Sequence, residues 1–271
     1  MDKLELSIII VDYNSSQFTI DLIKNLEEKL TDLRFEIIVV DNNPNSNDDK
    51  KIKETHKNLK KLEIIKAEKN LGFAAGNNIG AKKARGEYLL LLNPDTKIID
   101  DSIQKMLDFI VKHPEIGALT PLLIQRDEKT LQRHFYGDFQ SLSSVIIKRT
   151  RDRSLKGNGE DFFYVDMASG AALMIRRSIF KQVGGFDENF FMYIEDDDLC
   201  RRIAELGLKN AVMTSAKIIH FEGQSSTSME KKKFYYKSQD YYWQKHYGPA
   251  MTQLMKILRA PYIWWQTLTS K

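Results

Sequence analysis

Four short, largely apolar runs recur along the first hundred residues, at positions 6–11, 36–40, 62–65 and 88–92. Runs of this length are typical of strands that are covered on both faces of a sheet. Polar residues bound each run, so the sequence predicts four separate buried strands in this half of the chain.

The intervals between these runs have helical patterns. Apolar residues recur every four positions between Phe18 and Leu30, and residues 52–59 and 74–84 are also predicted to be helical. Strands and helices that alternate in this way imply right-handed crossovers and a parallel sheet. The expected fold class is therefore α/β, with a Rossmann-like, mostly parallel central sheet flanked by helices.

The second half of the chain continues the pattern less regularly. Helices are predicted over 101–112, with Asp100 or Asp101 as the cap, and over 195–206. The strands predicted here cover 116–120, 171–175, 210–213 and 217–221. From about residue 230 the pattern is helical again, so we divide the chain into one domain, 1–228, and a helical extension, 229–271.

Residues 122–162 form an irregular excursion that is rich in lysine and arginine. Charged runs of this kind are usually solvated surface loops. The alternative is a loop that binds the acceptor or faces a membrane. The pattern alone leaves both interpretations open.

Composition narrows the classes of function. The formal net charge is only +4, without the strong basic excess of a nucleic-acid-binding domain, so no nucleic-acid partner is expected. Cys200 is the single cysteine, which excludes an internal disulfide and suits a reducing compartment. The first residues lack the features of a signal peptide, and no apolar run approaches the roughly 18 residues that cross a bilayer.

Polar residues follow three of the predicted strands at the point where each strand ends. They are Asp12-Tyr13-Asn14-Ser15, Asp41-Asn42-Asn43-Pro44 and Asn93-Pro94-Asp95. Turns favour Asp, Asn and Pro in any case. However, ligands of open α/β sheets bind beyond the carboxyl ends of the strands, so three such endings predict a polar crevice.

Asp95 is the sharpest candidate in this crevice. Its carboxylate could hold a divalent cation that bridges two phosphates, and it lies too far upstream to cap the helix at 101. The glycine-rich segment 69–80 could place the amide groups of a helix start against an anion, or it could be purely structural.

Four acidic residues stand together from Glu195 to Asp198 at the start of a predicted helix. The helix dipole favours acidic residues there, but four adjacent carboxylates repel one another. Helical spacing places Glu195 and Asp198 on one face and Asp196 on another. The apolar stretch 190–194 could desolvate one carboxyl and raise its pKa, which would make it a better general base.

Taken together, these motifs resemble those of the family 2 glycosyltransferases, which have the GT-A fold. The matching segments, in order, are 7–14, 39–43, 70–78, 92–96, 184–188, 195–202 and 220–226. Their order and spacing cover about residues 6–226 and make the set specific. The branch that the chain resembles contains bacterial rhamnosyltransferases and galactofuranosyltransferases of cell-surface polysaccharides.

The resemblance implies donor contacts along this crevice. Asp41 would contact the nucleobase, and Asp12 with Tyr13 would line the base and ribose pocket. The full set of implied donor-binding residues is Asp12, Tyr13, Asp41, Asn78, Asn93, Asp95 and Ser225.

The resemblance also implies a metal site and a base. Asp95 matches the last position of the family's metal-binding Asp-any-Asp motif, while Asn93 stands at its first position and removes one negative charge. His220 would complete a site for Mg²⁺ or Mn²⁺. Asp196 matches the family's catalytic base.

The implied reaction is the inverting transfer of a sugar from a nucleotide-diphosphate donor to a glycan or lipid-linked acceptor. L-rhamnose from dTDP-rhamnose is the expected sugar, with a UDP-hexose or UDP-galactofuranose as alternatives. A second alternative is an inactive relative that binds nucleotide sugars without catalysis. The presence of Asp196 at the position of the base is evidence against it. A nucleotide-sugar pyrophosphorylase would need a glycine-rich, basic signature after the first strand, and residues 12–16 contain none.

The extension 229–271 mixes basic residues with aromatic and aliphatic ones. This composition suits a helix in a membrane interface. It suits equally a helix packed on the domain or on the second subunit of a homodimer. The expected location is the cytoplasm, with peripheral contact at the inner face of the cell membrane as one of these alternatives.

Overall fold

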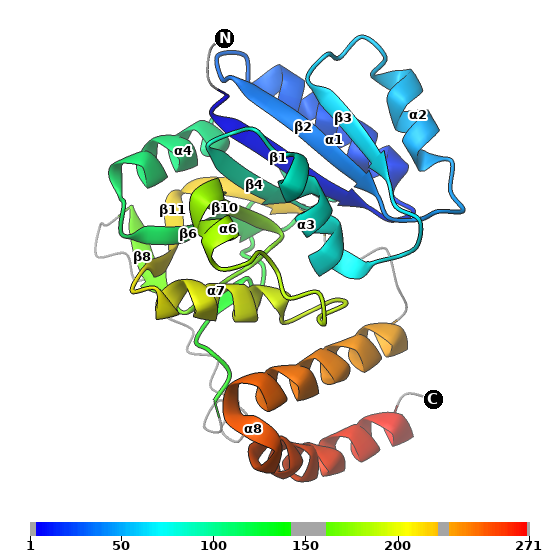
Figure 1. The fold of residues 1–271 in the computed structure, drawn as a ribbon, viewed down its shortest axis with the longest axis vertical. Helices are drawn as coiled ribbons and strands as arrows, with labels where there is room; N and C mark the ends of the chain where they lie inside the picture. Colours follow the sequence, from blue (N-terminus) through cyan, green and yellow to red (C-terminus); the bar gives the residue numbers. More distant parts are fainter. Residues whose placement is uncertain (1–3, 142–160, 222–227, 270–271) are drawn as a thin grey trace.

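The computed structural model describes residues 4–141, 161–221 and 228–269. Its first half alternates strands and helices as predicted (Figure 1). The elements are β1 (Leu6–Asp12), α1 (Ser16–Lys29), β2 (Phe35–Asp41), α2 (Asp48–Thr55), β3 (Leu62–Lys66), α3 (Gly72–Lys83) and β4 (Tyr88–Leu92). The four strands are parallel and lie in the order β3-β2-β1-β4.

The second half adds strands of both directions. Its elements are β5 (Thr96–Ile98), α4 (Ser102–Lys112), β6 (Ile116–Ile124), β7 (Tyr136–Gly137), β8 (Phe162–Val165), β9 (Met167–Ala168), β10 (Ala172–Arg176), α6 (Arg177–Gln182), α7 (Glu195–Glu205), β11 (Lys209–His220) and α8 (Ser228–Thr269). The sheet continues from β4 through β10, β6 and β11 to β5. β10 runs antiparallel to both of its neighbours, and it joins the two parallel parts of the sheet.

Several predicted boundaries need correction. β6 runs to Ile124 rather than 120, so it enters the predicted irregular excursion 122–162, and α2 ends at Thr55 rather than 59. Helix α2 begins at Asp48 rather than 52, because Asp48 and Asp49 occupy its first turn, where the helix dipole favours acidic side chains. The strands predicted at 210–213 and 217–221 are one strand, β11, whose register against β6 shifts between Met213 and Lys217. Of the two predicted caps of α4, Asp101 occupies the N-cap position without a side-chain cap hydrogen bond, and Asp100 Oδ1 accepts a hydrogen bond from the Ser102 N–H at 2.9 Å.

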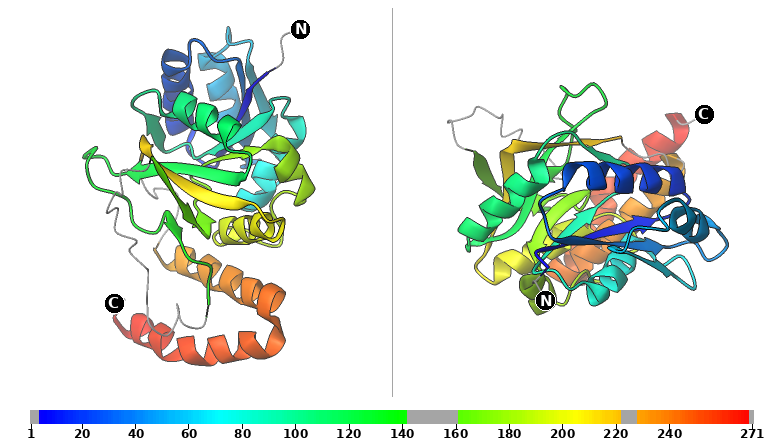
Figure 2. Two further views of the ribbon diagram at one scale, coloured as in Figure 1. Left: turned by 90° about the vertical axis from the view of Figure 1, so that its left-hand side faces the viewer. Right: turned by 90° about the horizontal axis from the view of Figure 1, so that it is seen from above.

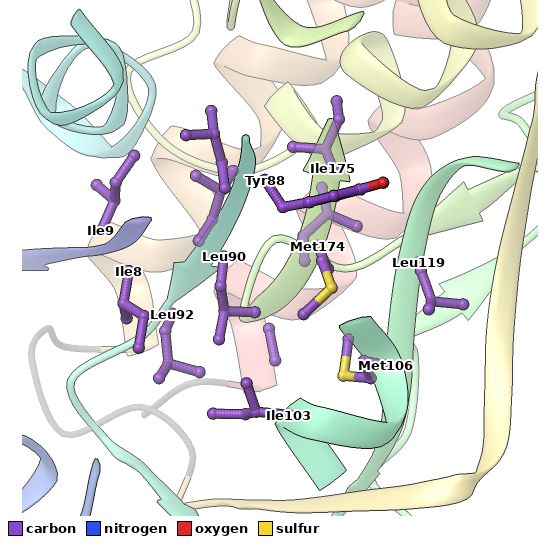
Figure 3. Close-up of a cluster of buried hydrophobic side chains, with 14 of the residues drawn as sticks. Ile8, Ile9, Tyr88, Leu90, Leu92, Ile103, Met106, Leu119, Met174 and Ile175 are labelled. Carbon is purple, nitrogen blue, oxygen red and sulfur yellow. The ribbon is translucent and has the colours of Figure 1, made fainter. Parts of the chain in front are cut away.

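The hydrophobic core lies against the middle of the sheet. Ile8, Leu90 and Met174 come from the adjacent strands β1, β4 and β10, and Ile103 and Met106 of α4 pack onto them (Figure 3). All five side chains are fully buried. Burial of this extent stabilises the sheet and therefore fixes the strand ends, where the polar residues lie.

The helices cover both faces of the sheet. α1 and α2 lie on one face, as the right-handed crossovers between β1, β2 and β3 require, and α3, α6 and α7 lie on the other (Figures 1 and 2). The acidic residues at the start of α7 are therefore on the same side of the sheet as α3.

Helix α8 is a hairpin of two helices that forms a further layer beneath α7 (Figures 1 and 2). The helical geometry is broken at Gly248, whose φ of 83° is one that glycine adopts readily, and Pro249 follows it. Over the ranges that the structure describes, no helix combines the length and the apolar character needed to span a membrane.

Candidate active site

Asp12 and Asp41 end two neighbouring parallel strands and lie in register with each other. Both side chains are fully buried. Asp12 accepts hydrogen bonds from Ser15 Oγ (2.9 Å) and Thr19 Oγ1 (2.5 Å). Asp41 accepts one from Ser46 Oγ at 2.9 Å. The two carboxylates therefore hold the loops that follow their strands, and donor contacts through them stay predictions.

Tyr13 follows Asp12 in the first loop and is exposed (37%), as is its neighbour Asn14. Beside it, Asn14 has a left-handed backbone (φ 56°), and its Oδ1 accepts a hydrogen bond from Asn43 Nδ2 at 2.6 Å. This contact ties the loop after β1 to the loop after β2. The two strand ends thus form one polar edge, as predicted.

Asn93, Asp95 and His220 lie together at the other side of this edge. His220 Nε2 is 3.2 Å from Asp95 Oδ1 and 3.3 Å from Asn93 Nδ2. The opposite ring nitrogen, Nδ1, lies 2.8 Å from Gln132 Oε1. An amide oxygen only accepts hydrogen bonds, so His220 Nδ1 donates to Gln132 Oε1, while Nε2 faces Asp95.

This pair fits a divalent cation. An imidazole nitrogen and a carboxylate oxygen are both ligands that divalent metal ions accept. Two ligand atoms at about 2.1 Å from a metal ion and about 90° apart are about 3.0 Å from each other. The observed 3.2 Å between Asp95 and His220 is close to this value. Within the described residues no group of three or more His, Cys, Asp or Glu side chains could hold a metal, so a bound ion would need ligands beyond these two side chains.

The start of helix α3 does not offer free amide groups to an anion. The N–H groups of residues 71, 72 and 73 donate to Asn42 Oδ1 (3.0 Å), Asn70 Oδ1 (3.0 Å) and Phe191 O (2.8 Å). The prediction that this helix start could hold an anion is therefore wrong for these three groups. The glycine-rich segment instead binds the turn that precedes α7.

Two residues of α3 show how close this contact is. Gly72 has a φ of +80°, and a Cβ there would lie 2.1 Å from Phe191 O, so the position requires glycine. Asn78 donates from Nδ2 to Phe186 O at 2.8 Å and accepts at Oδ1 from Phe186 N at 2.9 Å. Its amide is engaged within the protein, and a donor contact through Asn78 stays a prediction.

Asp196 lies at the start of α7 and is partly exposed, whereas Glu195, Asp197 and Asp198 are buried. Its Oδ2 accepts a hydrogen bond from Gly170 N at 3.1 Å. Burial raises the pKa of Asp196, although the hydrogen bonds from main-chain N–H groups oppose the shift. A partly exposed carboxylate with a raised pKa has the properties that a general base needs.

The other acidic residues of the run differ from Asp196. Burial, and then the charge of Asp196, raise the pKa of Glu195 well above its usual range, and burial does the same for Asp197. Burial would also raise the pKa of Asp198, but the hydrogen bond from His246 and the charge of Arg202 outweigh it and lower the pKa. These partners therefore favour the ionised form of Asp198, and the carboxylate has a structural role.

The turn before Asp196 is strained. Tyr193 and Ile194 both have a φ of 69°, which is rare for any residue with a side chain and rarer for a β-branched one. The Ile194 side chain is buried in a cluster with Phe190, Tyr242 and Trp243. Strain of this kind persists where the surrounding packing over-determines the backbone, and it is concentrated at functional sites.

Comparison with known families decides the assignment. The sequence model of the family described as "Glycosyl transferase family 2" matches residues 7–184, which is more than half of the chain. The chain belongs to glycosyl transferase family 2. A second family, described as "N-terminal domain of galactosyltransferase", matches residues 153–238.

Among curated relatives, this family 2 glycosyltransferase is similar to "Rhamnosyltransferase WbbL" of Escherichia coli (strain K12), with 28% identity over 84% of this chain and 87% of the relative. It is 23% identical to "dTDP-rhamnosyl transferase RfbF" of Shigella flexneri, over 82% of this chain and 70% of the relative. The chain spans 41% of a third relative, the uncharacterised glycosyltransferase MJ1057 of Methanocaldococcus jannaschii.

Solved structures confirm the GT-A type of fold. One is GalNAc-T7 with UDP, GalNAc and Mn²⁺, with a TM-score of 0.65 and 16% identity over 96% of this chain and 54% of that chain. Another is S. aureus TarS 1-349 in complex with UDP-GlcNAc, with a TM-score of 0.62 and 18% identity over 88% of this chain and 65% of that chain.

Of the predicted site residues of this family 2 glycosyltransferase, Ser225 lies outside the described residues. Sequence reasoning missed Gly170 and Gln132, which contact Asp196 and His220, and the contact between His246 and Asp198. No local motif marks Gln132 or His246. For Gly170 the signal was weak, because Ser169 and Gly170 precede a predicted strand without another distinguishing feature.

Proposed function

We propose that this family 2 glycosyltransferase transfers L-rhamnose from dTDP-rhamnose to a saccharide acceptor, free or lipid-linked, with inversion at the anomeric carbon. Asp196 is the general base. Two relatives whose printed names specify rhamnosyl transfer support the sugar. The reaction belongs to the synthesis of a cell-surface polysaccharide.

A chain of hydrogen bonds between Asp196 and the end of β4 is the main support for this proposal. Gly170 N donates to Asp196, and the next residue, Ala171, accepts a hydrogen bond at its carbonyl from Asn93 N at 2.9 Å. Two consecutive residues therefore connect the candidate base to the end of β4, just beyond which Asp95 lies beside His220. A base and a diphosphate-binding group on opposite sides of a reacting carbon are what a single displacement requires.

In this mechanism Asp196 takes the proton from a hydroxyl group of the acceptor. The acceptor oxygen then forms a bond to the anomeric carbon as the bond from that carbon to the diphosphate oxygen breaks. The electron pair leaves with the nucleoside diphosphate. The main-chain N–H groups of Gly170 and Asp197 orient the Asp196 carboxylate during this step.

Asp95 and His220 would hold Mg²⁺ or Mn²⁺, with Asn93 beside them. Such an ion supplies positive charge that stabilises a departing diphosphate. The solved structure of GalNAc-T7 contains Mn²⁺ together with UDP, which supports a divalent metal for this fold. The neutral side chain of Asn93 lowers the negative charge of the site, so we expect a weaker metal site than two aspartates would form.

The nucleobase and ribose are assigned to the edge formed by the loops after β1 and β2. Tyr13 provides the exposed ring of that edge. A UDP-linked hexose is the alternative donor, since TarS was solved with UDP-GlcNAc.

A donor panel tests the proposed function. The purified protein would be incubated with Mn²⁺ and dTDP-rhamnose, UDP-glucose, UDP-GlcNAc or UDP-galactofuranose, and the release of nucleoside diphosphate would be measured. We expect slow release from dTDP-rhamnose without an acceptor. Release from a UDP-sugar alone would correct the donor, and release from none would contradict transferase activity.

The second helix of α8 provides an exposed apolar strip that consists of Leu254, Ile257 and Leu258. This strip could contact the inner face of the membrane or the second subunit of a homodimer, which are the two alternatives that the sequence indicates for the extension. Flotation with liposomes and sedimentation of the Ile257→Glu variant beside the unmodified protein would separate them. Loss of flotation alone indicates the membrane, and loss of a dimer alone indicates the second subunit.

A further inference from the structure

The first helix of α8 lies along the strained turn that leads into Asp196 (Figure 1). Phe234 stacks on Phe191, with ring centroids 4.9 Å apart and an interplanar angle of 27°. Four residues later, Ser238 Oγ donates a hydrogen bond to Met192 O at 2.8 Å. One face of α8 is thus fixed against residues that immediately precede the candidate base.

Tyr235 follows Phe234 on this helix and is 40% exposed. Its ring centroid lies 6.4 Å from that of Tyr193 and 5.8 Å from that of Tyr236. Burial, and then the negative charge of Asp197 together with a smaller effect of Asp196, raise the pKa of Tyr235 to about 12. Tyr193 is three residues before Asp196, so its contact with Tyr235 places the Tyr235 ring beside the turn that leads into the acidic run.

The arginine that contacts these rings is paired within the hairpin. Arg259, from the second helix of the hairpin, lies over the Tyr236 ring at 4.8 Å. Its guanidinium donates to Gln239 Oε1 at 2.7 Å and to Asp240 Oδ1 at 2.6 Å. A neutral ligand with apolar faces and hydroxyl groups suits the exposed aromatic rings.

We propose that Tyr235 and Tyr193 form the acceptor subsite of this enzyme and bind a neutral pyranose of the acceptor glycan. The inference rests on the proposed function and adds the chemical class of the acceptor. The C–H groups of a sugar face carry a small positive charge that matches the negative face of an aromatic ring. A sugar on these rings lies beside α7, where its free hydroxyl can reach Asp196.

Kinetics with neutral synthetic acceptors test the proposal. The probes are octyl glycosides of rhamnose, glucose, galactose and N-acetylglucosamine, and their binding is also measured by saturation-transfer NMR. We expect Tyr235→Ala to raise the KM for the accepted glycoside at least tenfold. Tyr235→Phe, which keeps the ring, should stay within about threefold of the unmodified enzyme. Hydrolysis of the donor without acceptor should stay within twofold in both variants.

A matched control is Tyr164→Ala, which removes an equally exposed tyrosine (42%) from β8. It should leave the KM for the glycoside unchanged. A KM for Tyr235→Ala within twofold of the unmodified enzyme would overturn the proposal. So would an enzyme that hydrolyses its donor but neither binds nor glycosylates any of the four glycosides. If no donor is hydrolysed, the proposed function itself fails, and the subsite fails with it.

Discussion

His246 Nε2 donates a hydrogen bond to Asp198 Oδ1 at 2.8 Å and so joins α8 to the helix that carries Asp196. The same carboxylate contacts Lys245 Nζ and the Arg202 guanidinium, each at 2.7 Å, and it is fully buried. The C-terminal hairpin is therefore connected to the candidate active site through a buried ionic cluster. Its helices contribute to the position of the acidic run.

Replacement of Asp198 by asparagine should destabilise the protein by about 3–5 kcal/mol, because it removes the fully buried charge that Lys245 and Arg202 share. Urea unfolding measures this change. The control is Asp101→Asn, which affects an exposed pair with Lys105 and should cost about 1 kcal/mol or less. Equal effects of the two substitutions would show that the buried cluster contributes no special stability.

Because the pKa of Asp198 is lowered in the folded protein, we expect the protein to lose stability as the pH falls. The pKa of Asp198 is lower in the folded protein than in the unfolded chain. Its contribution is therefore fully present above the unfolded value of about 3.9 and is lost as the pH falls through the folded value. Asp198→Asn should remove this part of the acid-induced loss of stability.

Gly72→Ala should disturb the site as well as the backbone. Its added Cβ would lie 2.1 Å from Phe191 O, so the turn before α7 would have to move. Gly184→Ala is the matched control, because Gly184 has nearly the same φ, +81°, with nothing within 4 Å of the added Cβ. Gly184→Ala should lower the free energy of unfolding by only about 1–2 kcal/mol, which is the cost of backbone strain.

Thermal unfolding and donor hydrolysis distinguish the two glycine variants. Gly72→Ala should lose more stability than Gly184→Ala and most of its activity, whereas Gly184→Ala should keep its activity at temperatures where it is folded. Comparable activity in both variants would mean that the contact between α3 and the turn before α7 does not position Asp196.

Much of the fold could be predicted because β1 to β4 are local apolar runs with polar ends. The antiparallel direction of β10 could not, since the apolar residues 172–175 carry no information about direction. The approach of Asp95 to His220 followed from resemblance, and the antiparallel pairing of β5 with β11 explains it. The inward orientation of Asp12 depends on Thr19, one turn into α1, which a strand-end pattern does not reveal.

The least predictable part is the contribution of α8. Asp198 and His246 are 48 residues apart, and their contact depends on how a whole hairpin packs on α7. Composition of the extension indicated aromatic and basic character but not which residues face the site. The different pKa shifts of Asp196 and its acidic neighbours likewise depend on how deeply each carboxyl is buried. Four adjacent acidic residues in a sequence do not reveal this.

Asp95→Ala tests the proposed metal site. Calorimetry of dTDP binding with Mn²⁺ and with EDTA should show at least tenfold tighter binding with Mn²⁺ for the unmodified enzyme. The variant should bind equally weakly in both conditions, because it has lost a carboxylate ligand. Asp127→Ala, which removes an exposed carboxylate from the loop after β6, should behave like the unmodified enzyme. A metal effect that survives in Asp95→Ala would contradict the assignment.

The acid limb of the pH–rate profile tests whether the base is a buried carboxylate. Burial raises the pKa of Asp196, so the rate should fall with decreasing pH at a midpoint above the usual value of about 3.9. The measurement is kcat/KM for transfer between pH 4 and 8 at saturating metal. A midpoint at or below the usual value would be inconsistent with a desolvated base.

Asp196→Asn tests whether Asp196 removes the proton from the acceptor. The substitution keeps the size of the side chain and an amide oxygen that can accept from Gly170 N, but it removes the basic group. The measurement compares kcat for transfer with the dissociation constant of the donor nucleotide. We predict that kcat falls by about three orders of magnitude or more while nucleotide binding changes less than threefold. Transfer at a near-normal rate by the Asp196→Asn enzyme would contradict the assignment of Asp196 as the general base.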